Sequence, residues 1–85
     1  MRNLAVESHV CLHGWVTLPS GEVEYADLEL EDVDGYSVYF RFPTPQDPQQ
    51  PFDITDEQDF TSLEEARFYA QGLAARRGVS HIEEY

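Results

Sequence analysis

Alternation of apolar and polar residues, interrupted by two turn signals, dominates the first half of the chain. In residues 6–18 the valines and leucines fall on even positions, and residues 36–42 alternate in the same way. Such a period of two is typical of half-buried strands. Pro19-Ser20-Gly21 and Asp34-Gly35 supply short turns on either side of a third strand-like segment, residues 22–34. The sequence therefore predicts an antiparallel meander of three strands.

The second half predicts one helix and one more short strand. Four prolines make residues 43–51 an extended connection. Ser62 and Glu65 form a capping-box pattern, apolar residues then recur at helical spacing, and Gly78 follows, so we expect a helix over residues 62–77. Residues 79–83 read as a strand. The expected fold is α+β: a single domain, residues 1–85, with an antiparallel sheet of three to four strands in βββαβ order and one helix on one face.

The segment between the two turns is unusually acidic. Seven of the thirteen residues from Glu22 to Asp34 are carboxylates and none is basic. The alternation slips in phase within this segment, and a bulge near Tyr25 and Ala26 would restore it, placing the apolar residues on the core. The other face would then carry a row of five acids: Glu22, Glu24, Asp27, Glu29 and Glu31. Neighbouring acids in such a row are about 6.6 Å apart, close to twice the rise per phosphate of one DNA strand.

The sheet face without the helix is predicted to be both acidic and aromatic. It would carry the acid row together with Trp15 from the first strand and Tyr39 from the third, and we take these seven residues as the candidate partner-binding set. Two alternatives stay open. The acids could serve only for solubility and to keep a sheet edge from pairing, and the proline-rich connection could cover the two aromatic residues.

Net charge restricts the classes of partner. The chain has a formal net charge of −12, from seventeen acids and five arginines without any lysine. A basic footprint for nucleic acid is absent, so direct DNA or RNA binding is not expected. We expect instead a basic protein surface, such as that of a nucleic-acid-handling complex. A single cysteine and the lack of a signal-peptide or membrane-spanning pattern favour a cytoplasmic protein without a membrane partner.

The residues that suggest chemistry do not form a convincing active or metal site. His9, Cys11 and His13 lie on one strand face, but the two histidines would be about 13 Å apart, too far to share one ion. The acidic run from Asp53 to Glu64 has the length of a calcium loop but places Gln58 where that loop needs glycine. No orienting base or oxyanion donors accompany Cys11. We therefore expect no enzyme activity, metal or cofactor.

Two resemblances bear on fold and function. The segment Phe60-Thr61-Ser62-Leu63-Glu64-Glu65-Ala66, followed by Ala70, Leu73 and Gly78, resembles the strand-helix-strand ending of many small prokaryotic and phage proteins. In class, a very acidic, lysine-free small domain is similar to phage nucleic-acid mimics, including several anti-CRISPR proteins, although no family-specific motif carries this likeness. It implies an inhibitor that blocks a basic surface sterically, in the cytoplasm of the host. The alternative is a structural or assembly subunit that uses its open sheet for protein contacts, and the oligomeric state stays open.

Overall fold

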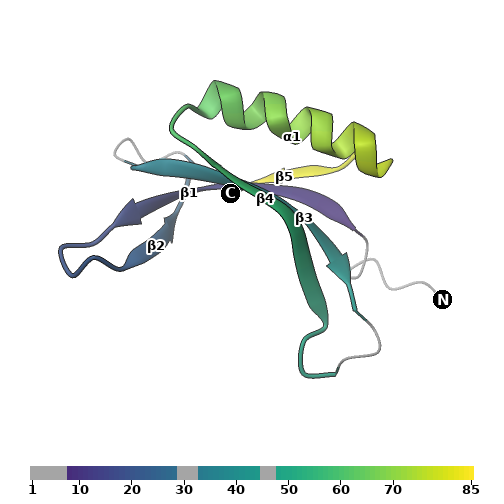
Figure 1. Ribbon diagram of the computed structural model, residues 1–85, viewed down its shortest axis with the longest axis horizontal. Helices are drawn as coiled ribbons and strands as arrows, with labels where there is room; N and C mark the ends of the chain where they lie inside the picture. Colours follow the sequence, from purple (N-terminus) through teal and green to yellow (C-terminus); the bar gives the residue numbers. More distant parts are fainter. Residues whose placement is uncertain (1–7, 29–32, 45–47) are drawn as a thin grey trace.

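The computed structural model describes residues 8–28, 33–44 and 48–85, which form a five-stranded sheet and one helix (Figure 1). The elements in chain order are β1 (His9–Thr17), β2 (Val23–Ala26), β3 (Gly35–Pro43), β4 (Phe52–Phe60), α1 (Leu63–Arg77) and β5 (Ile82–Glu84). The predicted α+β class and the helix are confirmed. The predicted meander is wrong, because β1 lies between β2 and β3 and these two strands are not neighbours in the sheet. The strand β4 was not predicted, since the sequence pattern assigned residues 52–60 to no strand or helix.

Strand pairing places β1 and β3 at the centre of the sheet. The order is β2-β1-β3-β4, and these neighbours are antiparallel. The short β5 pairs with β1 in parallel, at the end of β1 that β2 leaves free. The last strand therefore departs from the antiparallel pairing predicted for it, since the chain crosses over through α1 before it returns to the sheet.

The core lies between α1 and one face of the sheet. It is formed by even-numbered residues of β1 and β3 and by one side of the helix: Val10, Leu12, Val38, Phe40, Ala66, Ala70, Leu73 and Ala74. Three of the four buried helix residues are alanines. The helix begins at the predicted cap, where the Glu65 amide donates to Ser62 Oγ at 3.3 Å. It ends at Gly78, whose φ of 70° is the left-handed conformation that favours glycine.

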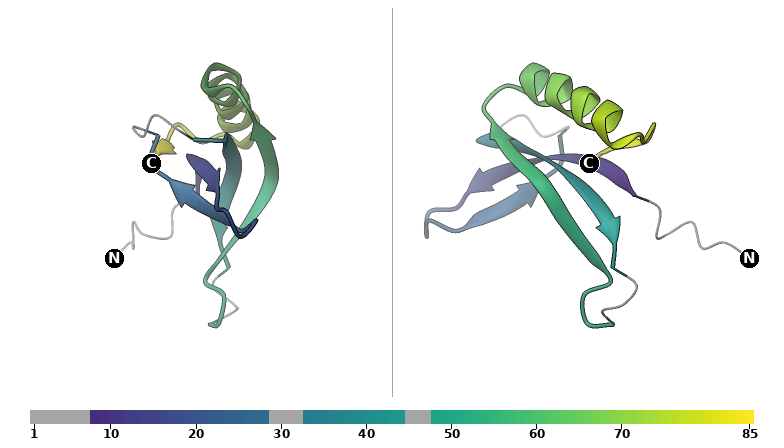
Figure 2. Two further views of the ribbon diagram at one scale, coloured as in Figure 1. Left: turned by 90° about the vertical axis from the view of Figure 1, so that its left-hand side faces the viewer. Right: turned by 45° about the vertical axis from the view of Figure 1, so that its right-hand side comes forward.

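The sheet divides into two arms that diverge on the side away from the helix. The β1–β2 hairpin forms one arm and the β3–β4 hairpin the other, while α1 lies across their junction (Figures 1 and 2). Part of the bend in the second arm comes from a bulge in β4. The register shifts between Val38 and Phe40, and Asp56 takes a φ of 59° there. Two helix side chains hold the bulge: Tyr69 donates to the Asp56 carbonyl at 2.9 Å, and Arg77 pairs with the Asp56 carboxylate.

Candidate functional site: the open face of the sheet

The sheet face opposite α1, here called the open face, carries the odd-numbered side chains of the two central strands. Paired residues of antiparallel strands share a face, so the register also places residues of β2 and β4 on it. The open face contains Cys11, His13 and Trp15 of β1, Val23 and Tyr25 of β2, Ser37, Tyr39 and Arg41 of β3, and Glu57 and Asp59 of β4. Glu83 of β5 and the following Tyr85 complete it. The two predicted aromatic residues are therefore on this face.

The predicted acid row does not form as a single row. Trp15 pairs with Tyr25 and Val16 with Glu24, without a break in register, so the expected bulge near Tyr25 and Ala26 was wrong. Tyr25 consequently lies on the open face, and Glu24 lies on the face that carries α1. The change in the apolar alternation is explained by the end of the strand and not by a bulge. The strand β2 ends at Ala26, and Leu28, beyond that end, contacts the core.

The remaining members of the row are separated from one another. Glu22 precedes β2 and is exposed, and its carboxylate accepts from Ser20 Oγ at 3.3 Å. Asp27 follows β2 and lines a pocket on the open face. Glu29 and Glu31 fall outside the residues that the structure describes. Because Glu24 and Asp27 lie on opposite sides of the sheet, the regular spacing that suggested a phosphate backbone is not present in the described part of this segment.

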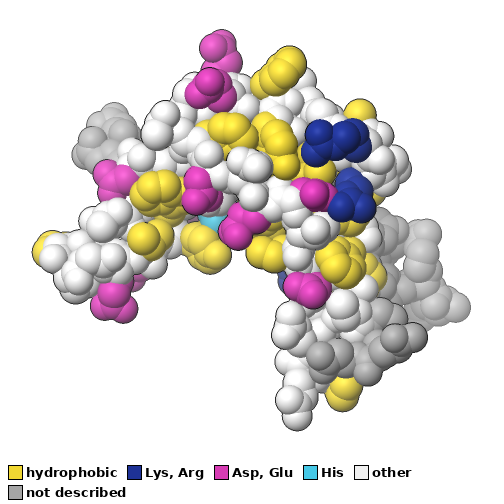
Figure 3. All heavy atoms as spheres, in the orientation of Figure 1, with side chains coloured by type: hydrophobic (Ala, Val, Ile, Leu, Met, Phe, Trp, Pro, Cys, Tyr) yellow, Lys and Arg dark blue, Asp and Glu magenta, His cyan; other side chains and the backbone are white. Residues whose placement is uncertain are grey.

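Acidic side chains reach the open face from the strand that was not predicted. Ser37 Oγ donates to Asp59 Oδ1 at 2.6 Å, and Glu57 lies beside it on the same edge strand. Both acids line a hollow of about 290 Å³, here called the Trp15 hollow, together with Trp15, Val23, Tyr25 and Ser37. In the space-filling view, acidic and hydrophobic side chains border the space between the two arms (Figure 3). The open face is therefore acidic and aromatic, as expected, but the acids shown on it here are Glu57 and Asp59 of β4 and not the predicted row.

The sequence held a signal for β4 that the bulge obscured. Phe52, Ile54 and Phe60 all have even numbers and are separated by polar residues, as in a half-buried strand. The bulge places them on different faces, because Ile54 pairs with Arg41 of the open face and Phe60 pairs with Tyr36 of the core face. Apart from that alternation, the acidic sequence of this segment resembles a loop. Residues 53–60 belong to the strand β4, so the acidic run from Asp53 does not form the calcium-binding loop considered from the sequence.

Trp15 packs closely against the backbone of β3 on the open face. Its ring lies so close to Gly35 that a Cβ built on that glycine would be 2.3 Å from Trp15 Cζ2. The indole is half-buried, and its Nε1 is buried without a hydrogen-bond partner. The described ends of the proline-rich connection, Thr44 and Pro51, are bonded to each other at the far end of β3 from Gly35. These ends of the connection therefore do not cover Trp15.

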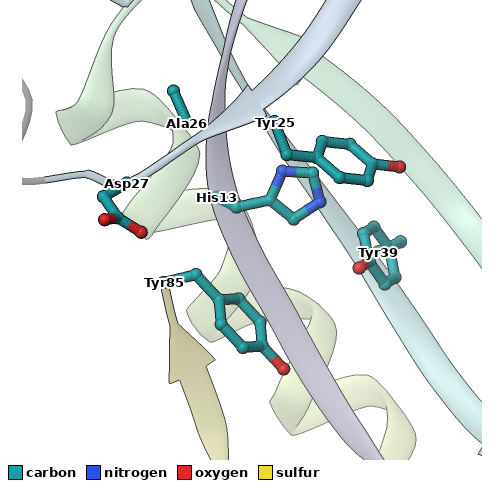
Figure 4. Close-up of a pocket in the computed structure, with 6 residues that line it drawn as sticks. All are labelled: His13, Tyr25, Ala26, Asp27, Tyr39 and Tyr85. Atoms are coloured by element: carbon teal, nitrogen blue, oxygen red, sulfur yellow. The ribbon is translucent and has the colours of Figure 1, made fainter.

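A second concavity, here called the His13 pocket, has a volume of about 260 Å³ and lies beside the Trp15 hollow. It is lined by His13, Tyr25, Ala26, Asp27, Tyr39 and Tyr85 (Figure 4). The His13 ring centroid is 4.0 Å from that of Tyr25 and 5.4 Å from that of Tyr39. Sequence reasoning assigned Tyr25 to the core and left Tyr85 out, so it missed this site; only the register of β2 and the return of β5 bring these residues together.

A buried thiol stabilises the floor of the open face. Cys11 is fully buried, and burial raises the pKa of its thiol despite opposing hydrogen bonds to Tyr39 and Tyr85. Burial also raises the pKa of both phenols. The Tyr85 hydroxyl donates to Glu83, and this bond, with a second from His81, lowers the pKa of that carboxyl. A protonated, buried thiol is a poor nucleophile.

Positive charge is concentrated on the helix. Arg67 pairs with Glu84 at 2.9 Å and Arg77 pairs with Asp56, whereas Arg41 lies on the open face over the Phe52 ring at 3.9 Å. Within the described ranges, no arginine lines the His13 pocket or the Trp15 hollow. In that same part of the chain, no three His, Cys, Asp or Glu side chains are grouped so as to hold a metal ion.

Comparison with known proteins adds no further constraint. No family model, curated protein or solved structure matches the chain. Among the described residues, no helix is long and apolar enough to cross a membrane. The charge and geometry of the open face are therefore the features of this chain that bear on its function.

Proposed function

We propose that this chain is a non-enzymatic binding protein that covers a basic protein surface with its open face. The observation that carries this proposal is the Trp15 hollow, where Glu57 and Asp59 border the indole and the exposed ring of Tyr25. No arginine among the described residues lines this hollow. Aromatic side chains surrounded by acidic ones contribute to such an interface in two ways. The rings provide buried area at low entropic cost, and the acids attract a cationic partner over longer distances.

The proposed partner is a surface that normally holds nucleic acid. Such surfaces collect Lys and Arg side chains on one face, and a chain of net charge −12 is complementary to them. Binding there would exclude DNA or RNA sterically, as an anti-CRISPR-like inhibitor does. The acids that support this version are Glu57 and Asp59 of β4, with Asp27 and Glu83. Glu24 does not contribute, because it lies on the other side of the sheet.

Two double variants with equal loss of charge test which acids matter. Glu57→Gln/Asp59→Asn removes two charges from the open face and keeps an oxygen acceptor for Ser37. Glu22→Gln/Glu24→Gln removes two exposed charges from the β2 segment. Fluorescence anisotropy with a labelled peptide of alternating arginine and serine should show affinity falling by about three- to tenfold for the first pair and by clearly less for the second. Equal losses would mean that net charge alone matters, and no loss for the first pair would refute the proposal.

Exposed apolar residues on β2 favour one second candidate, an assembly subunit that pairs with itself through the same face. Val23 is 60% exposed and Tyr25 is 74% exposed, although both belong to a strand. Sedimentation analysis distinguishes the two functions. A stable oligomer that Tyr25→Ser dissociates, combined with no binding of the cationic peptide, would favour assembly.

A further inference from the structure

The His13 pocket contains a buried hydrogen-bonding atom that the protein leaves unused. His13 is only 5% exposed, and its Nδ1 lies 3.3 Å from the Gly14 carbonyl oxygen. A carbonyl oxygen can only accept, so Nδ1 carries a proton, and in that tautomer Nε2 is an acceptor. Nε2 is buried without a partner and points between the rings of Tyr25 and Tyr39 (Figure 4). An acceptor in this state is costly, and a donor entering the pocket would satisfy it.

The walls of the pocket favour a flat cation. Three tyrosine rings surround His13, with centroids 4.0 Å (Tyr25), 5.4 Å (Tyr39) and 6.3 Å (Tyr85) from the imidazole. Aromatic faces attract cations, and cages of such rings are a known way to bind cationic groups. The carboxylate of Asp27 adds a negative charge to the lining. Acceptor, aromatic walls and carboxylate are therefore complementary to one group that both donates hydrogen bonds and carries positive charge.

The volume of the pocket limits the size of its occupant. At about 260 Å³ it is smaller than the range of roughly 300–1,000 Å³ typical of sites for drug-sized ligands. It suits the end of one side chain. Guanidinium fits better than ammonium, because it is planar, stacks on aromatic rings, presents several N–H donors and is more weakly hydrated.

We propose that the His13 pocket binds the guanidinium group of an arginine side chain on the partner protein. This inference rests on the proposed function, in which the partner surface is basic, and it names the side chain that the open face recognises. One N–H would donate to His13 Nε2, while the plane of the group lies against the tyrosine rings and its charge is balanced by Asp27. The Trp15 hollow would then accept the residues on either side of that arginine.

The test uses a single amino acid derivative in place of the unidentified partner. N-acetyl-arginine-methylamide is titrated into the isotope-labelled full chain, with the corresponding lysine derivative and the uncharged citrulline derivative as controls. We expect saturable changes at the His13 Nε2 resonance and at the Tyr25 ring for arginine, smaller changes for lysine and none for citrulline. Changes of equal size for all three compounds, or none with arginine, would overturn the proposal.

Variants of exposed residues test the aromatic wall without disturbing the core. Tyr25→Leu should weaken arginine binding by about two- to fivefold, the size expected of a cation–π contact at an exposed site, and Tyr25→Phe should retain it. Phe68→Leu is the matched control, since Phe68 is a ring on α1 that is 80% exposed and lies outside the pocket. An unchanged affinity in Tyr25→Leu, or an equal loss in Phe68→Leu, would contradict the assignment of the pocket.

The outcome for the pocket is separable from that for the proposed function. If the arginine derivative does not bind, but the arginine-serine peptide still binds wild type and loses affinity in Glu57→Gln/Asp59→Asn, the pocket assignment is wrong and the binding function stands. If neither compound binds, the proposed function fails as well. Binding of both compounds, each sensitive to its own variant, supports both statements.

Discussion

The Trp15 indole packs over the backbone of Gly35, and this contact shapes the open face. The indole occupies the space where a side chain at position 35 would be, so the glycine is required by packing. Gly35 was recognisable in the sequence as part of a turn signal, but its role under Trp15 was not, because the register that pairs these two residues depends on the whole β1–β3 ladder. The aromatic part of the site therefore depends on one position that carries no side chain.

Replacing Gly35 by alanine should destabilise the protein through this contact. The added methyl group would displace the indole, at a cost of about 1–3 kcal/mol in the free energy of unfolding. Gly72→Ala is the matched control: Gly72 lies inside α1 with open space around it, so alanine there should add about 0.5–1 kcal/mol. Urea denaturation measures both. Since the predicted cost arises from Trp15, it should shrink in a Trp15→Leu background, and a cost unaffected by that change would contradict the explanation.

Elements with regular periodicity were predictable, and those whose periodicity is interrupted were not. The first and third strands and the helix each carry an uninterrupted period, and their core faces agree with expectation. β2 ends before its apolar pattern does, so Tyr25 was assigned to the wrong face. In β4 a bulge at Asp56 hides the strand, and the contacts that stabilise it come from α1. Tertiary contacts of this kind leave no local signal in the sequence.

The end of β5 gives the molecule a measurable pH dependence. Hydrogen bonds from the Tyr85 hydroxyl and from His81 hold the pKa of Glu83 below its usual value. A carboxyl whose pKa is lowered by folding stabilises the native state above its unfolded pKa, and this stabilisation disappears as pH falls through the folded pKa. The free energy of unfolding of wild type should therefore exceed that of Glu83→Gln near neutral pH, by less than about 1 kcal/mol because solvent reaches the partly exposed side chain.

Urea denaturation of both proteins at a series of pH values checks this. The difference between them should be constant down to about pH 5 and should shrink in more acidic solution, where Glu83 becomes protonated in wild type. A difference that is independent of pH, or that grows on acidification, would mean that these hydrogen bonds do not favour the carboxylate.

At the scale of the whole molecule, charge and shape combine to make the two sides of the sheet different. One side is covered by α1, which carries Arg67, Arg76 and Arg77, and the other is an open face whose two concavities are lined by acids and aromatic rings. Composition alone predicted an acidic protein with a cationic partner. The positions of the acids depend on the strand register, which composition does not determine. The structure shows that the acids of the candidate site lie in the hollow between the two arms and not along the β2 segment.

The central claim is that the open face, and not the bulk negative charge, binds the cationic partner. Backbone amide shifts of the isotope-labelled wild-type chain, followed during titration with the arginine-serine peptide, test it most directly. We predict that the residues shifting most are His13 and Trp15 of β1, Tyr25 of β2, Tyr39 of β3 and Glu57 and Asp59 of β4, with α1 nearly unaffected. Shifts concentrated around Glu22 and Glu24, or spread evenly over all exposed acids, would contradict the account.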